Sequence, residues 1–439
     1  MRVVVVGAGL AGMRATEQLR LAGCEVVLIE GGTRVGGRVR TVREPFAGGQ
    51  YSESGAEWVD DVHQRMLAAL DRYGIRRLGP GEKWTTVRRW VHRHGELMSP
   101  EAVRAADPLV FDELTEFDRL LEEAALGITD PSRPESHPAA DALDARSLAD
   151  VAEQAQLGEL ANLFKRRDSQ GEFAAEPNDV SLLFVAQQRA YQREESAGAT
   201  VLSHRVEGGF GRLAEAMAAG LDGLISFDEQ LIGVDQDADE VTVRTSRRSL
   251  SCDHVVLACS LVPLRKVQFQ PGMPAALERA VLQLGYGTVT KTSVQWPTRN
   301  WPGGYATSDG PAQRVYEPTA DQPGEQGILM SYCGGDGGHE WARFSEAERI
   351  AMATNEMRAM HHLESAPLGG FSRAWSTQPR YGGSYAVYQP GQVTAHWRVL
   401  REPWGRVHLA GEHVATCTGY MEGALESGEA VAARIVESE

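Results

Sequence analysis

The chain has 439 residues, 42% of them apolar and 24% charged, which is enough for about three domains of ordinary globular composition. Its formal net charge of −16 would repel a nucleic-acid backbone, so we expect no nucleic-acid partner. The acidic balance fits plain solubility, and it also fits the attraction of a small cation into a cleft.

The cysteines and the N-terminal segment indicate the cellular compartment in which the protein is expected. The five cysteines form no CxxC pair and are odd in number, which favours a reducing compartment and a cytoplasmic location. The apolar run at residues 3–13 is too short to span a membrane and contains three glycines. We therefore expect neither a targeting peptide nor a membrane anchor.

The first 30 residues have the pattern of a strand, a helix and a second strand. The β-branched run at residues 3–6 stops at a glycine, a helical pattern continues to Leu19, and a second apolar strand at 26–29 ends in Glu30. This order predicts an α/β fold with a parallel sheet.

The turn after the first strand is the motif Gly7-x-Gly9-x-x-Gly12. Gly7 permits the tight turn, Gly9 lets the backbone approach a pyrophosphate, and Gly12 lets the helix pack against the strand. Glu30 is then placed to bind the ribose hydroxyls. The motif predicts a dinucleotide site at a helix N-terminus, and the acidic residue argues against a 2′-phosphate without distinguishing NAD from FAD.

A second glycine pair follows, Gly36-Gly37, and Arg38 comes directly after it. A guanidinium at this place suits a phosphate group, although a solvated surface turn is the simpler alternative.

The rest of the chain leaves this domain and returns to it. Residues 79–188 have mostly helical periodicity, strand-like runs occur at 240–245, 254–258, 288–296 and 328–332, and a strand at 407–410 precedes a helix at 421–436. We expect a discontinuous Rossmann-like FAD-binding domain at 1–78, 205–285 and 386–439. An α+β substrate-binding domain at 79–204 and 286–385 would be inserted into it. No metal site is expected, since the pair His361-His362 fits a solvated helix end.

The sequence resembles the flavin-dependent amine oxidase family, which includes monoamine and polyamine oxidases and, more distantly, L-amino acid oxidases. The resemblance extends from end to end and is weakest between about 80 and 200. The matching residues are 3–41, 53–58, 207–209, 254–263, Lys291, Trp375, 383–385 and 409–432.

The resemblance implies an FAD cofactor and assigns residues to it. The adenine end would lie on the first glycine motif and Glu30, with Arg38 near the pyrophosphate and Leu231 near the adenosine. Gly55 belongs to a matching motif, and the isoalloxazine end would be held by Gly411, Glu412 and Met421. The helix that begins near Met421 would point its positive N-terminal end at the flavin.

Two departures from the mitochondrial monoamine oxidases are informative. Their flavin-tethering cysteine falls at Ser384 here, so a thioether at this position is excluded and we expect noncovalent FAD. Their C-terminal membrane helix has no counterpart before Glu439, which predicts a soluble enzyme.

Amine oxidation needs an uncharged nitrogen in a dry cavity, and burial favours the uncharged amine. By resemblance, Tyr385 and Tyr420 are facing rings in front of the flavin, and Trp375 supports the pocket. Core packing is the alternative for all three. Only four of the 44 basic residues are lysines, so Lys291 within a strand-like run suggests a need for a compact, titratable ammonium. The family has a lysine here that is bridged through water to flavin N5, whereas an exposed strand-edge lysine is the alternative.

These observations favour oxidation of a small-molecule amine to an imine, with molecular oxygen reduced to hydrogen peroxide. An L-amino acid oxidase would need an arginine to bind the substrate carboxylate, and Trp58 stands where such relatives carry one. An FAD-dependent desaturase or dehydrogenase of a biosynthetic intermediate would share the fold, as would a noncatalytic flavoprotein. The resemblance also favours a homodimer.

Overall fold

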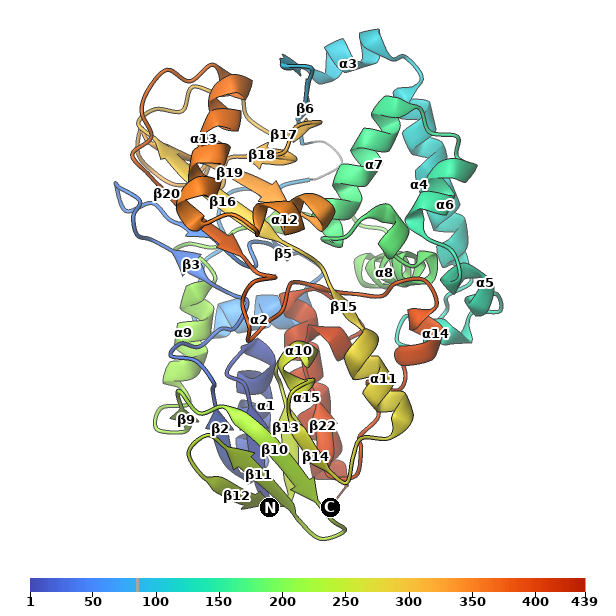
Figure 1. Ribbon diagram of the computed structural model, residues 1–439, viewed down its shortest axis with the longest axis vertical. Helices are drawn as coiled ribbons and strands as arrows, with labels where there is room; N and C mark the ends of the chain where they lie inside the picture. Colours follow the sequence, from blue (N-terminus) through green and yellow to red (C-terminus); the bar gives the residue numbers. More distant parts are fainter. Residues whose placement is uncertain (84–86, 439) are drawn as a thin grey trace.

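The structure is a computed structural model that describes residues 1–83 and 87–438. A five-stranded parallel sheet lies near both chain ends in the lower part of the molecule (Figure 1). Its strands, in spatial order, are β22 (Val407–Leu409), β13 (His254–Leu257), β1 (Arg2–Val6), β2 (Glu25–Ile29) and β9 (Ile225–Ser226). The sheet therefore combines segments that are more than 400 residues apart in the chain.

The central strand β1 is apolar on both faces because both faces are covered. Val3 and Val5 belong to a core shared with helices α1 (Leu10–Leu21) and α15 (Met421–Glu437). Val4 and Val6 face a second core, which continues into the helical part of the molecule. This burial explains the uninterrupted run of valines.

A seven-stranded sheet forms the second part of the molecule (Figure 1). Its strands, in order, are β20 (Gly369–Ala374), β16 (Thr290–Trp296), β19 (Gly327–Cys333), β18 (Arg314–Tyr316), β17 (Tyr305–Ser308), β6 (Arg89–Arg93) and β7 (Glu96–Met98). Strand β16 is buried along its whole length and pairs with neighbours on both sides. Helix α13 (Glu346–His361) packs against β16 and β20.

Smaller sheets and further helices complete the structure. The small sheets are β12 (Ser249–Cys252), β11 (Val241–Thr245), β10 (Leu231–Gln236) and β14 (Gln268–Gln270), and the pairs β3 (Thr41–Val42) with β4 (Ser52–Glu53), β5 (Val59–Asp60) with β8 (Ser203–His204), and β15 (Gly285–Tyr286) with β21 (Ala386–Val387). The remaining α-helices are α2 (Gln64–Arg72), α3 (Pro100–Ala106), α4 (Val110–Leu126), α5 (Ala140–Asp144), α6 (Leu148–Gln154), α7 (Glu159–Glu172), α8 (Leu182–Ser196), α9 (Gly211–Ala219), α10 (Leu261–Leu264), α11 (Ala275–Gln283), α12 (Gly335–Trp341) and α14 (Gln392–His396).

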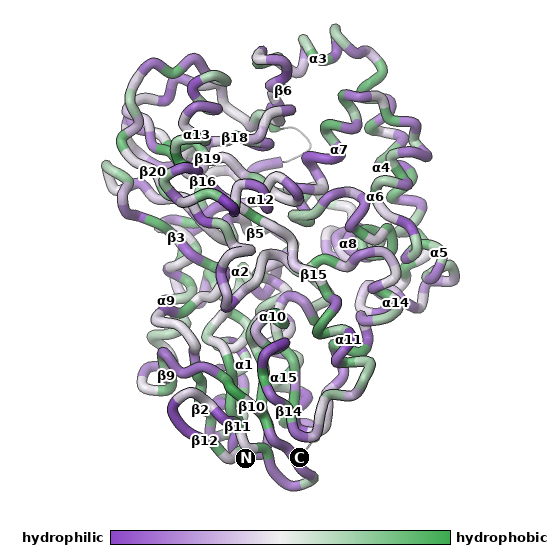
Figure 2. The backbone as a smooth tube through the Cα atoms, viewed as in Figure 1, coloured by the Kyte–Doolittle hydropathy of each residue, from purple (hydrophilic) through white to green (hydrophobic). Residues whose placement is uncertain are grey.

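The predicted α/β class and the return of the chain to the parallel sheet are confirmed. Hydrophobic and hydrophilic segments alternate along α4, as its amphipathic spacing predicts (Figure 2). The helical region differs in detail, because it also contributes β6 and β7 to the large sheet. Within this region α6 and α7 are separate helices, because Gln156 between them has a φ of +53° and Gly158 is the N-cap residue of α7. The exact domain boundaries stay our proposal.

Within the described residues, no helix is both long and apolar enough to cross a bilayer. The same residues contain no cluster of three or more His, Cys, Asp or Glu side chains suited to a metal ion.

The contact between α1 and α15 depends on a glycine. A Cβ atom at Gly428 would lie 2.5 Å from the Ala11 carbonyl oxygen and 3.1 Å from the Ala15 nitrogen. We predict that Gly428→Ala lowers the apparent midpoint of thermal unfolding by a few degrees, because the overpacking penalty of about 1–3 kcal/mol exceeds the gain in helix propensity of about 1 kcal/mol. Gly272→Ala, where a Cβ meets open space, is the matched control, and equal midpoints in both variants would contradict the prediction.

Candidate active site

One large cavity lies between the parallel sheet and the seven-stranded sheet. Its volume is about 1760 Å³, and its walls include Glu30 and Tyr420 from the first part and Lys291 and Tyr332 from the second. Pockets for one small ligand usually measure about 300–1,000 Å³. The cavity therefore has room for a dinucleotide cofactor and a substrate together.

The structure brings almost all sequence-predicted site residues to this cavity. Its lining includes Gly7, Gly9, Glu30, Gly36, Gly37, Arg38, Gly55, Leu231, Lys291, Trp375, Tyr385, Gly411, Glu412, Tyr420 and Met421. Gly12 is the exception, because it lies against the turn, where a Cβ would be 1.9 Å from the Gly7 carbonyl oxygen. That position matches the helix-packing role predicted for the third glycine.

The dinucleotide end of the cavity is built around the start of α1. Gly7 has a φ of +106°, which favours glycine, and a Cβ at Gly9 would meet no atom within 4 Å. Helix α1 has no side-chain N-cap, so its first N–H groups are available to an anion. Glu30 accepts hydrogen bonds from the Ala8 and Gly32 amides at 2.9 and 2.7 Å, which orient its carboxylate at the cavity wall.

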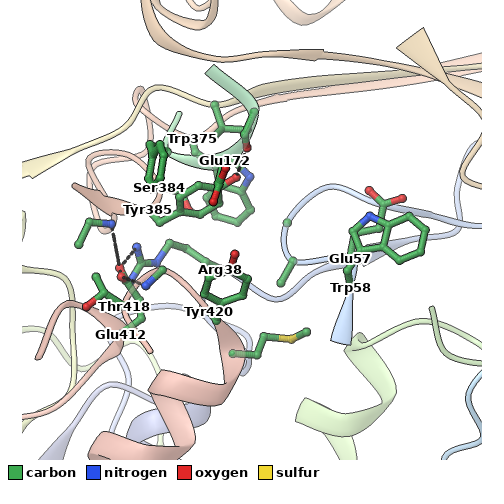
Figure 3. A pocket seen from close by; sticks show the side chains of 18 of the residues that line it. Arg38, Glu57, Trp58, Glu172, Trp375, Ser384, Tyr385, Glu412, Thr418 and Tyr420 are labelled. Atoms are coloured by element: carbon green, nitrogen blue, oxygen red, sulfur yellow. Dashed lines mark hydrogen bonds and ion pairs between the residues drawn. The ribbon is translucent and has the colours of Figure 1, made fainter. Parts of the chain in front are cut away.

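Glu412 connects the cofactor side of the cavity with the aromatic side. Its carboxylate pairs with Arg38 Nη1 at 2.7 Å, and Figure 3 shows the two side chains joined. It also accepts hydrogen bonds from the Ala386 amide at 3.2 Å and the Gly419 amide at 3.0 Å. These amides directly follow Tyr385 and precede Tyr420, so one buried carboxylate fixes both tyrosine segments.

The two predicted tyrosines both face the cavity (Figure 3). The Tyr385 hydroxyl donates to the Gly171 carbonyl at 2.7 Å and lies 2.7 Å from the Tyr332 hydroxyl. Tyr420 is 39% exposed toward the cavity, and its ring lies 5.2 Å from the His63 ring. Tyr420 is also the N-cap residue of α15, so the positive end of that helix points to the same space.

Trp375 and Gly55 form a tightly packed wall. The indole nitrogen of Trp375 donates to the Ser54 carbonyl at 2.6 Å. A Cβ at Gly55 would lie 1.9 Å from the Arg38 carbonyl oxygen and 3.3 Å from the indole. Only glycine fits there, which lets the Gly55 backbone approach the Arg38 segment so closely.

Lys291 is a buried member of an ionic network, and the strand-edge alternative is wrong because β16 is a central strand. Its ammonium donates to Glu57 Oε2 and to the Gly55 carbonyl, both at 2.9 Å. Glu57 also accepts from Arg205 Nε at 3.0 Å and from the Tyr316 hydroxyl at 2.7 Å. Burial alone would raise the pKa of Glu57, but the Lys291 and Arg205 charges lower it to about 2.

A second buried carboxyl group lies close to this network. Burial raises the pKa of Glu53 to about 7, although the Phe210 amide and the Thr41 hydroxyl donate hydrogen bonds that favour its ionised form. The nearby Glu57 charge raises this pKa further, and Lys291 opposes the rise. The Glu53 carboxyl group therefore titrates near neutral pH.

The residues present fit a flavin nucleotide. The glycine turn, the uncapped helix and Glu30 suit its nucleotide half, and the uncapped N-terminus of α15 suits negative charge on a reduced ring. His413 lines the same space, and its ring nitrogens have no hydrogen-bond partner among the residues that the structure describes. Burial also lowers the pKa of His413 to about 3, so this imidazole is neutral.

Comparisons with known proteins agree with this site. The model of the flavin containing amine oxidoreductase family matches residues 10–436. The chain belongs to this family. Its members use a flavin, and the predicted family relationship is confirmed.

Several relatives are similar to the chain along nearly its whole length. The L-amino acid dehydrogenase of Synechocystis sp. is 24% identical, with 99% of this chain and 94% of the relative covered. Human flavin-containing amine oxidase B is 26% identical, with 99% and 86% covered. Among solved structures, cyclohexylamine oxidase from Brevibacterium oxydans has a TM-score of 0.87 at 22% identity, and putrescine oxidase with bound putrescine has 0.87 at 20%. Each covers 100% of this chain and 99% of its own, and each shares the fold.

Several residues of the site were not predicted from the sequence, among them Glu57, Arg205 and Glu172. Glu57 lies inside a matching motif, but nothing in the motif indicated that it pairs with Lys291. Arg205 and Glu172 lie in or next to the region where the resemblance is weakest, so only their place in the fold reveals them.

Glu53 gives a prediction for the pH dependence of stability. Its pKa of about 7 in the folded state exceeds the unfolded value of 4.5, so the folded protein keeps a proton that the unfolded chain releases between these pH values. Stability should therefore fall as the pH rises through this window, by up to roughly 3 kcal/mol. We predict that Glu53→Gln flattens the dependence of the thermal midpoint on pH between about 5 and 7, while the exposed control Glu207→Gln does not. Equal slopes in Glu53→Gln and the unmodified protein would contradict this.

Proposed function

We propose that the protein uses noncovalently bound FAD to oxidise a small-molecule amine to the imine while oxygen is reduced to hydrogen peroxide. In this reaction R–CH₂–NH₂ and O₂ give R–CH=NH and H₂O₂, so the amine loses two electrons and two protons and oxygen gains them. The imine is then hydrolysed by water. Bound FAD supplies the electron transfer between the two reactants.

The dinucleotide end supports FAD, because Glu30 suits an unphosphorylated ribose and the cavity continues far beyond the nucleotide site. Ser384 lines the cavity next to Tyr385. A serine hydroxyl cannot form a thioether to the flavin, which supports noncovalent binding.

The ion pairs of three arginines are the reason why we propose an amine, and not an amino acid, as the substrate. Recognition of a substrate carboxylate needs a guanidinium that is free to form bidentate bonds. Arg205 instead pairs with Glu57 at 3.0 Å and stacks over Trp58 at 3.9 Å. Arg314 and Arg89 both pair with Asp168, at 2.7 and 2.8 Å. These guanidinium groups are already committed to protein carboxylates, which disfavours a carboxylate-bearing substrate.

The aromatic residues bind and desolvate the reacting amine. Walls formed by Tyr385 and Tyr420 exclude water, and burial favours the neutral nitrogen that the reaction requires. Burial also raises the pKa of the Tyr385 phenol to about 12, so this ring stays protonated at neutral pH. Trp375 supports the wall through its packing on Gly55.

The proposal is tested by peroxide release from the flavin-loaded protein in air, with primary and secondary amines beside the corresponding L-amino acids. We predict peroxide with amines and none with amino acids, because Arg205, Arg314 and Arg89 are already paired with protein carboxylates. Peroxide with amino acids alone would support the L-amino acid oxidase instead. Flavin reduction without peroxide, measured in parallel by absorbance, would show that oxygen is not the acceptor.

Lys291 provides a test of the oxygen step. Its ammonium is held at the cavity wall, where it can stabilise negative charge that develops on oxygen. We predict that Lys291→Met keeps its flavin and its rate of anaerobic reduction, but that reoxidation by oxygen slows by about 100-fold in stopped-flow measurements. Lys266→Met, at an exposed lysine on the nucleotide side of the cavity, is the control. Unchanged reoxidation in Lys291→Met would remove this role.

A further inference from the structure

Glu172 projects a carboxylate into the cavity. It is the last residue of α7, its side chain is exposed to the cavity space, and protein walls enclose that space. Within residues 1–83 and 87–438, no hydrogen bond or ion pair joins its carboxylate to another group, although the charges of Arg189, Arg314 and Lys165 act on it from farther away. This carboxylate loses its water when a substrate fills the cavity, which is costly unless the ligand supplies the opposite charge.

The position of Glu172 is fixed relative to the aromatic pair. The preceding residue, Gly171, accepts hydrogen bonds from the hydroxyls of Tyr385 at 2.7 Å and Tyr332 at 3.2 Å. The following residue, Phe173, is buried with its ring 5.8 Å from that of Phe184. Figure 3 shows Glu172 beside Tyr385 in the cavity wall.

The carboxylate acts electrostatically on both tyrosines. After burial, its charge is the largest contribution that raises the pKa of the Tyr420 phenol. It also adds to the raised pKa of Tyr385. Both rings therefore lie within electrostatic range of Glu172, and a ligand between or beside them would experience the same negative charge.

Two neighbouring carboxylates differ from Glu172 because protein cations already neutralise them. Asp168 pairs with Arg314 and Arg89. Asp118 pairs with Lys165 at 3.0 Å and Arg189 at 3.1 Å. These partners are thus directed at other acids, which leaves the Glu172 carboxylate free to bind a cation from the substrate.

The reacting nitrogen itself is a poor partner for this carboxylate. A negative charge next to an amine favours the ammonium form, and the ammonium form cannot be oxidised. Burial raises the pKa of Glu172 while no cation is bound, with Arg189 opposing the rise, and a ligand cation would favour its ionised form. The charge is therefore best matched by a second nitrogen, away from the reacting one.

We propose that Glu172 binds a second, cationic nitrogen of the substrate, and that the substrate is accordingly a diamine with one neutral nitrogen between Tyr385 and Tyr420. This inference rests on the proposed amine oxidation. It makes Glu172 a residue that determines specificity and leaves the chemical step to the aromatic pair and the cofactor.

The test compares matched diamines and monoamines on the flavin-loaded protein, using 1,4-diaminobutane against butylamine and 1,5-diaminopentane against pentylamine. We expect a higher kcat/KM for at least one diamine than for its monoamine. In Glu172→Gln that preference should fall by at least about tenfold, mainly through the KM of the diamine, because a charge-assisted hydrogen bond is lost. Monoamine oxidation should change little, and Glu172→Asp should retain part of the preference.

The control is Glu101→Gln, which removes one negative charge from an exposed residue at the edge of the same cavity. Flavin content and thermal midpoint are compared for all variants. The inference is overturned if the unmodified protein shows no diamine preference, if both glutamine variants lose it equally, or if Glu172→Gln slows both substrate types alike. A flavin that no amine reduces contradicts the proposed function itself, whereas monoamine reduction without diamine preference contradicts only the role of Glu172.

Discussion

The site depends on the buried carboxylate of Glu412. Its bonds to Arg38 and to the amides of Ala386 and Gly419 connect three segments, of which the Arg38 segment is 374 residues away from Glu412 in the chain. Two of these segments carry Tyr385 and Tyr420, and the third follows the glycine pair of the nucleotide site. Removing one partner of such a buried pair usually costs about 3–5 kcal/mol, because an uncompensated charge remains. The same interaction therefore supports the fold and aligns the aromatic pair with the cofactor side.

A second buried carboxylate has the same kind of role on the opposite wall. Glu57 holds Lys291 and Arg205 in fixed positions and keeps both guanidinium and ammonium charges compensated. Charges held in advance need little rearrangement during a reaction, and they act strongly where water is excluded. The cavity thus combines neutral aromatic walls with paired charges. Glu172 differs, because its carboxylate has no hydrogen bond or ion pair among the residues that the structure describes.

The sequence predicted those parts of the fold that depend on interactions between residues close together in the chain. Glycines in a turn, a run of valines and a helix that follows a strand each have a short-range cause. The parallel sheet was therefore predicted correctly, and the residues predicted for the nucleotide site line one cavity. The ion pairs could not be predicted, since Lys291 and Glu57 are 234 residues apart and meet only after both sheets form. The place of Glu172 in the cavity could not be predicted for a related reason. Helical periodicity in residues 79–188 does not indicate which end of a helix faces the cavity.

The acidic character of the chain fits this description but does not require it. A formal charge of −16 draws cations toward the protein in general, whereas binding at one place needs an unpaired carboxylate in an enclosed space. Among the described residues Glu172 meets that requirement, whereas Arg89, Arg205 and Arg314 of the cavity wall are each paired with a protein carboxylate.

The most direct test of this account is a crystal structure of the flavin-loaded protein. We predict that the flavin ring faces Tyr385 and Tyr420, that the Arg38 to Glu412 ion pair is retained, and that α15 points its first turn at the ring. A flavin ring bound elsewhere in the cavity, or tyrosines turned away from it while Glu412 keeps its three partners, would contradict the account.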